Sequence, residues 1–345
     1  MPKRHNRFLG YTCYPLTELR NGQVIPMTEA IDSALAKQAM IAYCTKKGAL
    51  AFGVADVDTL EKIAPKGHGP RDMLPRVKSV ISIGVGGGTK GAWAADAKTL
   101  AYIGDTETTA YRIAYGLAFM IEREYGAQAI FCPPDMDPEK GARTPMQSLK
   151  LHAEIAGIGA RSMAGDILLH PEFGMMYYAS VFTELEIPAD VPMEDNPCPH
   201  PSCVKLYKKS GKTPCMQFCP VDCISGTIDE AGKVLEMHYD AHACATMSQQ
   251  YEAIPSMLLD MMDAQDPIER GMAVHSPENQ LIWYKLSIGA GELLSLCYEC
   301  MRVCPITQTA LMADPVARGR GMRQKVAEAE AQAYAELDVE ADQGD

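Results

Sequence analysis

The most constraining feature of this sequence is the crowding of its cysteines into one part of the chain. Nine of the 12 cysteines in 345 residues lie between Cys198 and Cys304. Two groups carry a Pro directly after their last cysteine: Cys215-Met-Gln-Phe-Cys219-Pro220 and Cys297-Tyr-Glu-Cys300-Met-Arg-Val-Cys304-Pro305. The spacing is too tight for independent disulfides, and the sequence shows no export signal, so we interpret the region as a metal site.

Both groups have the spacing of iron–sulfur ligands. Clusters of the 4Fe–4S type need four thiolates, and in two-cluster ferredoxins the cysteine before Pro ligates the cluster of the other group. Applied here, this crossing predicts one cluster on Cys198, Cys203, Cys215 and Cys304. It predicts a second cluster on Cys219, Cys244, Cys297 and Cys300. Cys223 is left over, where a small buried residue normally follows the Cys-Pro turn.

Alternatives stay open at these cysteines. Zinc also takes four cysteines at CxxC spacing, although a Pro after the last cysteine in both groups is not typical of zinc sites. The first group also departs from the compact CxxCxxCxxxCP pattern. Four residues separate Cys198 from Cys203, and a lysine-rich stretch of eleven separates Cys203 from Cys215. The choice between Cys198 and Cys203 is therefore open, as is a three-iron or three-cysteine cluster.

Composition narrows the class of protein. Hydrophobic residues make up 47% and charged residues 22%, as in ordinary globular proteins, and the net charge is −12. An acidic chain is a poor ligand for a phosphate backbone unless it carries a local basic patch. No uncharged apolar run reaches the roughly 18 residues of a membrane span. We therefore expect a cytoplasmic protein with no membrane span and no nucleic-acid partner.

Hydrophobic periodicity predicts helices that alternate with strands before the cysteine region. A helix is expected over 28–48, with a Thr28 cap and an apolar stripe formed by Ile31, Leu35, Ala39 and Ala42. Further helices are expected at 106–125 and 149–156, and strands at 50–56, 79–85, 127–132, 166–169 and 175–182. This alternation predicts an α/β (α+β) fold. An acidic, proline-rich linker is expected at 184–197.

The chain divides into four predicted parts. They are an N-terminal extension (1–27), an α/β domain (28–190), a two-cluster domain with a helical insertion (191–314) and a charged helical tail (315–345). A simple electron carrier needs about 60 to 100 residues. The α/β part before the first cluster cysteine is much larger, so we expect it to accept the electrons. A non-enzymatic two-cluster electron-transfer protein is the alternative.

From about residue 30 to residue 310 the chain resembles the superfamily of cobalamin-dependent reductive dehalogenases and epoxyqueuosine reductases. The resemblance lies in the order of several short segments that end in two cluster groups. These segments are Ala49-Leu-Ala-Phe-Gly-Val-Ala55, Leu74-Pro-Arg-Val-Lys-Ser-Val-Ile81, Glu124-Tyr-Gly-Ala-Gln-Ala-Ile130, Ala156-Gly-Ile-Gly159, Leu168-Leu-His-Pro-Glu-Phe-Gly174 and Val181-Phe-Thr-Glu-Leu-Glu-Ile-Pro188. The resemblance implies a nitroreductase-like domain that binds a corrinoid, cobalamin, base-off. It also implies a ferredoxin-like domain with two 4Fe–4S clusters after it.

The resemblance also implies site residues. Tyr111, at the start of a helix, corresponds to the proton donor, with Arg112 or Arg143 as the neighbouring cation; the alternative for Tyr111 is a core residue. Asp135 or Asp137 corresponds to a substrate-contacting acid, although Asp is also a common turn former. Backbone at Gly86, Gly87 and Gly88 and the side chain of His170 are expected at the corrinoid. A flexible turn and a surface histidine are the alternatives. The chain has no DxHxxG motif, so no histidine is expected below the cobalt.

Two features separate the branches of the superfamily. The net charge of −12 and the 52 residues between Cys244 and Cys297 are unlike the tRNA-modifying branch. They favour a dehalogenase-like reductase that acts on a small organic substrate, halogenated or not, and receives electrons from an external donor such as a ferredoxin or flavodoxin. An epoxyqueuosine reductase-like enzyme that acts on tRNA is the alternative. The leaving group and the oligomeric state stay open.

Overall fold

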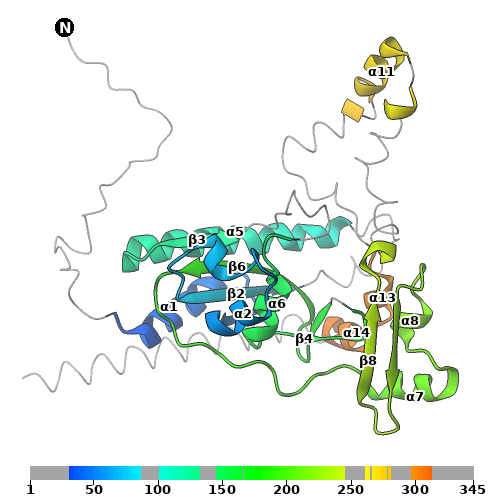
Figure 1. The fold of residues 1–345 in the computed structure, drawn as a ribbon, viewed down its shortest axis with the longest axis horizontal. Helices are drawn as coiled ribbons and strands as arrows, with labels where there is room; N and C mark the ends of the chain where they lie inside the picture. Colours follow the sequence, from blue (N-terminus) through cyan, green and yellow to red (C-terminus); the bar gives the residue numbers. More distant parts are fainter. Residues whose placement is uncertain are drawn as a thin grey trace, which may run out of the picture.

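An antiparallel sheet of six strands forms the centre of the α/β part of the chain (Figure 1). The computed structural model describes residues 31–86, 101–132, 145–165, 167–244, 261–264, 266–277, 279–280 and 297–312. The strands are β1 (Ala51–Ala55), β2 (Ser79–Gly86), β3 (Ala129–Cys132), β4 (Ala160–Arg161), β5 (Leu168–His170) and β6 (Gly174–Thr183). Their order is β1-β2-β6-β5-β4, with β3 also pairing with β6. Every described pairing in this sheet is antiparallel.

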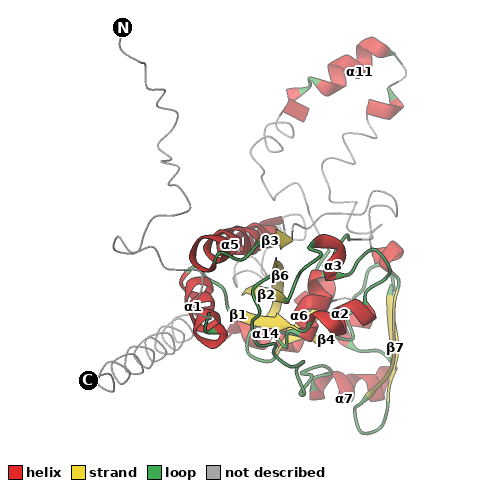
Figure 2. Ribbon diagram, turned by 60° about the vertical axis from the view of Figure 1, so that its left-hand side comes forward, coloured by secondary structure: helices red, strands yellow, loops and turns green. Residues whose placement is uncertain are grey.

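Helices cover both faces of the sheet. One face packs against α1 (Ser33–Lys46) and α5 (Ala101–Tyr125). The other face packs against α2 (Val57–Ile63) and α6 (Leu149–Ile155), with the short α3 (Pro70–Met73) beside them. Figure 2 shows the two helix layers on opposite sides of the strands. Central strand β2 is therefore buried on both faces and is apolar along most of its length.

The mixed α/β class is confirmed. The strands pair antiparallel, however, whereas helices that alternate with strands usually connect parallel strands. Here β1 and β2 are neighbours joined by α2 and α3, and the connection begins and ends at the same end of the sheet, so the two strands are antiparallel. The short helices α2 and α3 and the turn after them bring the chain back to the end of the sheet where β1 ends, so that β2 runs in the opposite direction.

The first helix shows where periodicity misled the prediction. The predicted cap, Thr28, lies outside the described residues. In the structure Asp32 caps α1, because its Oδ1 accepts the backbone N–H of Ala34 at 2.9 Å. The buried face carries Met40 and Cys44, whereas Leu35 of the expected stripe is 43% exposed. The expected stripe is wrong, because apolar residues surround this helix and only contact with the sheet selects a face.

The expected linker at 184–197 has no helix or strand, but it is held against the sheet. Asp190 accepts the backbone N–H of Val54 at 2.8 Å and pairs with Lys37, whose Nζ lies 2.7 Å from its carboxylate. Leu185 and Ile187 are buried, with 7% and 4% of their surface exposed. The segment therefore leaves β6 along a defined path toward the first cluster cysteine.

The cysteine region forms a second packed unit at one end of the sheet (Figure 1). Its elements are α7 (Pro201–Ser210), α8 (Pro214–Gln217), the hairpin of β7 (Ile224–Ile228) and β8 (Val234–Tyr239), α13 (Glu299–Arg302) and α14 (Pro305–Met312). One buried cluster joins it to the sheet: Met163, Leu169 and Met175 pack with Met216, Met301 and Ile306. The hairpin was not predicted.

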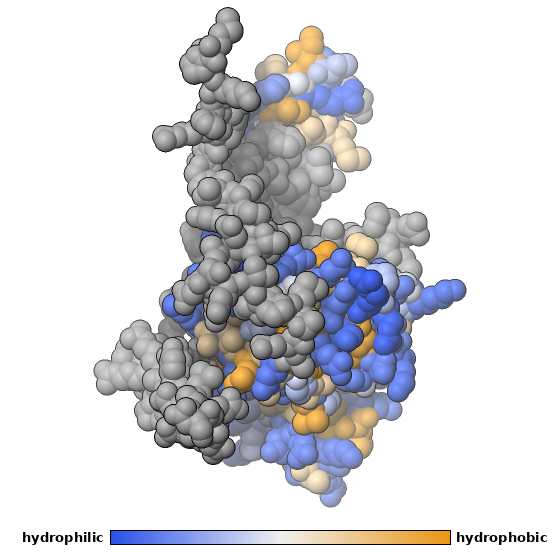
Figure 3. Space-filling view, turned by 90° about the vertical axis from the view of Figure 1, so that its left-hand side faces the viewer, coloured by the Kyte–Doolittle hydropathy of each residue, from blue (hydrophilic) through white to orange (hydrophobic). Residues whose placement is uncertain are grey.

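The insertion between the last two cysteine groups is described only in part. Its helix α11 (Pro267–Val274) has no buried residue and stands apart from the sheet in Figure 1. Ile268 and Met272 are 72% and 69% exposed, and hydrophobic residues are visible at this end of the molecule in Figure 3. Among the described helices, none is long and apolar enough to cross a bilayer.

A buried histidine beneath the sheet makes stability depend on pH. His152 on α6 is 2% exposed, and its Nδ1 lies 3.0 Å from the hydroxyl of Ser180 on β6. Burial lowers the pKa of His152 from its ordinary value of 6.5 to about 3. Below pH 6.5 the unfolded chain takes up a proton here and the folded chain does not, so folding loses about 1.4 kcal/mol per pH unit.

We expect His152→Gln to remove this dependence. Between pH 6.5 and 5 the free energy of unfolding of the variant should fall less steeply than that of the wild type, by about 1.4 kcal/mol per pH unit. Urea denaturation at several pH values under anaerobic conditions measures the two slopes. Equal slopes would show that His152 takes up its proton in the folded state.

Candidate functional site: two cysteine groups

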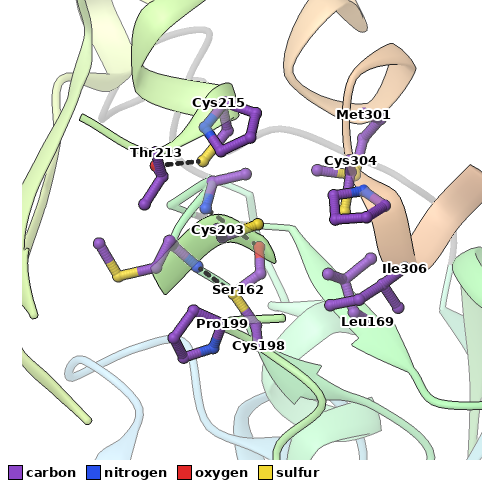
Figure 4. Close-up of a pocket in the computed structure, with 14 residues that line it drawn as sticks. Ser162, Leu169, Cys198, Pro199, Cys203, Thr213, Cys215, Met301, Cys304 and Ile306 are labelled. Atoms are coloured by element: carbon purple, nitrogen blue, oxygen red, sulfur yellow. Dashed lines mark hydrogen bonds between the residues drawn. The ribbon is translucent and has the colours of Figure 1, made fainter. Parts of the chain in front are cut away.

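Four cysteines from four separate segments face one cavity. The cavity measures about 340 Å³ with its open mouth included, and it is lined by Cys198, Cys203, Cys215 and Cys304. Figure 4 shows these side chains around a shared space. The remaining wall is mainly apolar and includes Met163, Leu169, Met301 and Ile306. The structure thus brings together the first of the two predicted sets.

Local hydrogen bonds position the first two sulfurs. The backbone N–H of Cys198 donates to Asn196 Oδ1 at 2.9 Å, and the backbone N–H of Met163 donates to the Cys198 sulfur at 3.3 Å. Cys203 lies in the first turn of α7, which His200 caps by accepting the backbone N–H of Ser202 at 3.2 Å. Pro201 at the first helical position favours this helix start.

The other two sulfurs belong to short helical segments that lie far apart in the sequence. Cys215 lies in α8, and the hydroxyl of buried Thr213 is 3.1 Å from its sulfur. Cys304 follows α13, where its backbone N–H donates to Met301 O at 3.2 Å, and Pro305 begins α14 directly after it. The Pro after the last cysteine therefore ends one helix and starts the next, which holds Cys304 at the junction.

Burial controls the ionisation of this group. Burial, together with the smaller effect of the neighbouring sulfurs, raises the pKa of Cys198 to about 12 and that of Cys203 to about 11. The isolated protein therefore favours neutral thiols here. Thiolate ligation by all four requires a positively charged centre between them, because metal binding displaces the thiol protons.

The second predicted set also converges. Cys219 follows α8, Cys244 follows β8, and Cys297 and Cys300 lie at the start of α13. Cys244 and Cys219 are near enough to contribute to the raised pKa of the Cys297 thiol, and Cys297, Cys244 and Cys219 all contribute to that of the Cys300 thiol. Burial raises the pKa of Cys300, and the first sulfur neighbour to raise it is Cys215 of the other group. The two groups are therefore adjacent.

The donor chemistry fits two four-iron clusters. Each group offers four cysteine sulfurs, the ligand set of a 4Fe–4S cluster. Within the described ranges, no three or more His, Cys, Asp or Glu side chains converge closely enough to hold a single metal ion. Four cysteine sulfurs are also a ligand set for zinc, which holds all four about 2.3 Å from one point, whereas in a four-iron cluster each sulfur binds a different iron. Among the described residues, all eleven cysteines are free of disulfides.

Two residues predicted at the corrinoid have local roles in the structure. Gly86 packs closely against Leu50: an added Cβ would lie 2.9 Å from Leu50 Cδ1. His170 Nδ1 accepts the backbone N–H of Glu172 at 3.1 Å, and its ring stacks on Phe173 at 4.6 Å. Burial lowers the pKa of His170. Contact of either residue with a corrinoid stays a prediction.

The predicted proton donor lies on the helix that covers the sheet. Tyr111 is half-buried on α5 and packs against the core between α5, α1 and the strands, while its neighbour Arg112 is exposed. This half-buried position is compatible with both predicted roles of Tyr111, a core residue and a proton donor. The other predicted residues, Gly87, Gly88, Asp135, Asp137 and Arg143, lie outside the described residues.

Sequence reasoning missed the groups that support the cysteines. The hydroxyls of Tyr177 on β6 and of Tyr298, which directly precedes α13, are hydrogen-bonded, which ties the second group to the sheet. Tyr298 directly follows Cys297, and this position within the cysteine motif is the one sequence feature that could have pointed to it. Asn196 and Thr213 carried no such signal, because each acts through a turn that only the folded chain forms.

Comparison with known proteins gives matches to solved structures alone: no family model and no curated protein matches the sequence. One match is a selenomethionine-labelled epoxyqueuosine reductase, at 18% identity and a TM-score of 0.45 over 79% of this chain and 66% of that chain. A second is a reductive dehalogenase whose structure suggests a mechanism for B12-dependent dehalogenation, at 15% identity and 0.47 over 78% of this chain and 38% of that chain.

A third match is an epoxyqueuosine reductase with an epoxyqueuosine-modified tRNA-Tyr stem loop, at 18% identity and a TM-score of 0.43 over 90% of this chain and 94% of that chain. Both groups of enzymes in the sequence resemblance are thus represented. The chain spans less than two thirds of the first match and about two fifths of the dehalogenase. These likenesses are distant, so the assignment of a function rests on the cysteine geometry.

Proposed function

We propose that this protein is an iron–sulfur reductase in which two 4Fe–4S clusters carry electrons to a corrinoid held by the α/β domain. The observation that carries the proposal is the convergence of eight cysteines into two adjacent groups of four. Each group takes a sulfur from the other group's motif: Cys304 joins the first and Cys219 joins the second. This is the ligand arrangement of a two-cluster ferredoxin unit.

The residues around the first group tune the electron transfer that clusters supply. The Met163 N–H and the Thr213 hydroxyl lie within hydrogen-bond distance of the sulfurs of Cys198 and Cys215. Such hydrogen bonds stabilise the more negative, reduced state of a cluster. Apolar Leu169 and Ile306 form part of the cavity wall. The Tyr177–Tyr298 pair holds the second group against the sheet, toward the domain that would accept the electrons.

The corrinoid is supported by the sequence resemblance and by the size of the α/β domain. Bound in such a domain, a corrinoid supplies low-valent cobalt, which acts as a nucleophile or one-electron donor. The segments at 87–100 and 133–144, which follow β2 and β3, lie outside the described residues, so no residue contact with it is derived. Tyr111 is the residue we propose to deliver a proton to the substrate, by analogy with the superfamily.

We propose a small organic substrate and dehalogenase-like chemistry, with an external ferredoxin or flavodoxin as the donor. The acidic net charge of −12 supports this choice over tRNA. One observation favours the tRNA-modifying alternative: α7 carries Lys205, Lys208 and Lys209, a local basic face beside the first cysteine group. Substrate assays therefore have to include both branches.

Reconstitution with iron and sulfide under anaerobic conditions tests the proposal. We expect about eight iron and eight sulfide per chain. Cobalamin added to this protein should give a corrinoid absorption spectrum that stays with the protein through gel filtration. Halide release from halogenated phenols, assayed beside epoxyqueuosine turnover, then separates the branches. Protein with full clusters and no bound corrinoid would leave only the electron-transfer role, and zinc in place of iron would remove both.

A further inference from the structure

A fifth cysteine lies in the second group. Cys219 and Cys223 belong to one turn, and their sulfurs are 3.3 Å apart. The backbone N–H of Cys223 also donates to the Cys219 sulfur at 3.3 Å. Asp222 between them has a left-handed backbone with φ of 48°, which turns the chain back toward Cys219. Asp tolerates this conformation better than most residues.

The hairpin holds Cys223 beside another member of the same group. Cys223 directly precedes β7, and the backbone N–H of Asp240, which follows β8, donates to Cys223 O at 2.9 Å. The backbone N–H of Cys244 in turn donates to Asp240 O at 3.0 Å. The Cys223 thiol consequently interacts with the sulfurs of both Cys219 and Cys244. The base of the hairpin thus places three sulfurs together.

The other spare cysteines of the described chain lie elsewhere. Cys44 packs between α1 and the sheet, and Cys132 lies in the core on the opposite face. Cys223 is buried, at 7% exposed, yet it also borders a shallow open cavity of about 880 Å³ with its open mouth included, lined by Ser225, His238 and Tyr239 among others.

We infer that Cys223 is a reserve ligand of the second cluster, which replaces Cys219 on the same iron. The inference rests on the proposed iron–sulfur function. In the exchange, the Cys223 thiol releases its proton to solvent and forms the iron–sulfur bond, while the bond from iron to Cys219 breaks and that thiolate takes up a proton. No oxidation state changes. A cluster that loses Cys219 therefore keeps four protein ligands.

The test is to count iron in variants of the reconstituted full chain. Cys219→Ala should retain about eight iron per chain, the same as wild type. The double variant Cys219→Ala/Cys223→Ala should fall to about four. The matched control is Cys300→Ala, which should also fall to about four, because the sulfur neighbours of Cys223 are Cys219 and Cys244. Reduced Cys219→Ala should show two interacting cluster signals by electron paramagnetic resonance, one with shifted g values.

Three results would overturn the inference. If Cys219→Ala, and also the shape-conserving Cys219→Ser, hold only about four iron, then Cys223 does not replace the lost ligand. If Cys223→Ala alone falls to about four, then Cys223 is an ordinary ligand and no reserve. Wild-type protein without clusters would overturn the proposed function as well, so the wild-type count separates the two failures. The retained first cluster reports in each variant that the chain has folded.

Discussion

Replacing Cys300 and Cys304 together by Ala should empty both cluster sites, although the two cysteines belong to one CxxCxxxCP motif. Each single variant should lose about half of the roughly eight iron per chain, and the double variant should lose nearly all of it. The reason is the proposed crossing: Cys304 faces the cavity with Cys198, whereas Cys300 lies near Cys297 and Cys219 as well as near Cys215 of the first group.

The matched control for this pair is the double variant Cys297→Ala/Cys300→Ala. Both of these cysteines belong to the second group, so the control should hold about four iron, no fewer than either single variant. Iron and sulfide analysis after anaerobic reconstitution measures all four proteins. If the Cys300→Ala/Cys304→Ala protein still holds about four iron, the motif serves one cluster and the crossing is wrong.

Ligand spacing predicted the four cysteines that line the first cavity, because the spacing of ligands within a motif is a short-range property that the sequence shows directly. A Pro follows both Cys219 and Cys304, and Pro305 begins α14 directly after its cysteine, since Pro favours the first position of a helix. The long gap between Cys203 and Cys215 looked like a disruption. In the structure α7 fills it as a capped helix that returns the chain to the same cavity.

Other parts of the fold could not be predicted from local pattern. β7 alternates, with Ile224 and Ile228 buried, but it has only five residues, and its partner β8 has no buried residue and no alternation that would mark a half-buried strand. The face that α1 buries depends on the sheet beneath it, since apolar residues lie around the whole helix. Residues such as Asn196, which binds the N–H of Cys198, act across a turn and leave no periodic signal.

Gly157→Ala should destabilise the protein by about 3 kcal/mol or more, among the largest costs expected for a single methyl group. Gly157 follows α6 with φ of +69°, a conformation that costs a non-glycine residue about 1–2 kcal/mol. An added Cβ would also lie 2.1 Å from the backbone carbonyl oxygen of Val191, which cannot rotate away. The segment that carries Val191 leads directly to Cys198, so relief of the clash displaces a ligand of the first cluster.

Gly126→Ala is the control that separates the cost of the backbone conformation from the cost of the clash with Val191. Gly126 has nearly the same φ, +65°, but an added Cβ there meets nothing within 4 Å. This control should cost only about 1–2 kcal/mol, the conformational part, and should leave the iron content unchanged. Urea denaturation under anaerobic conditions measures the free energies of unfolding, and iron analysis reports the cluster. Equal destabilisation of the two variants would show that the segment around Val191 yields without cost, and that it does not fix the position of Cys198.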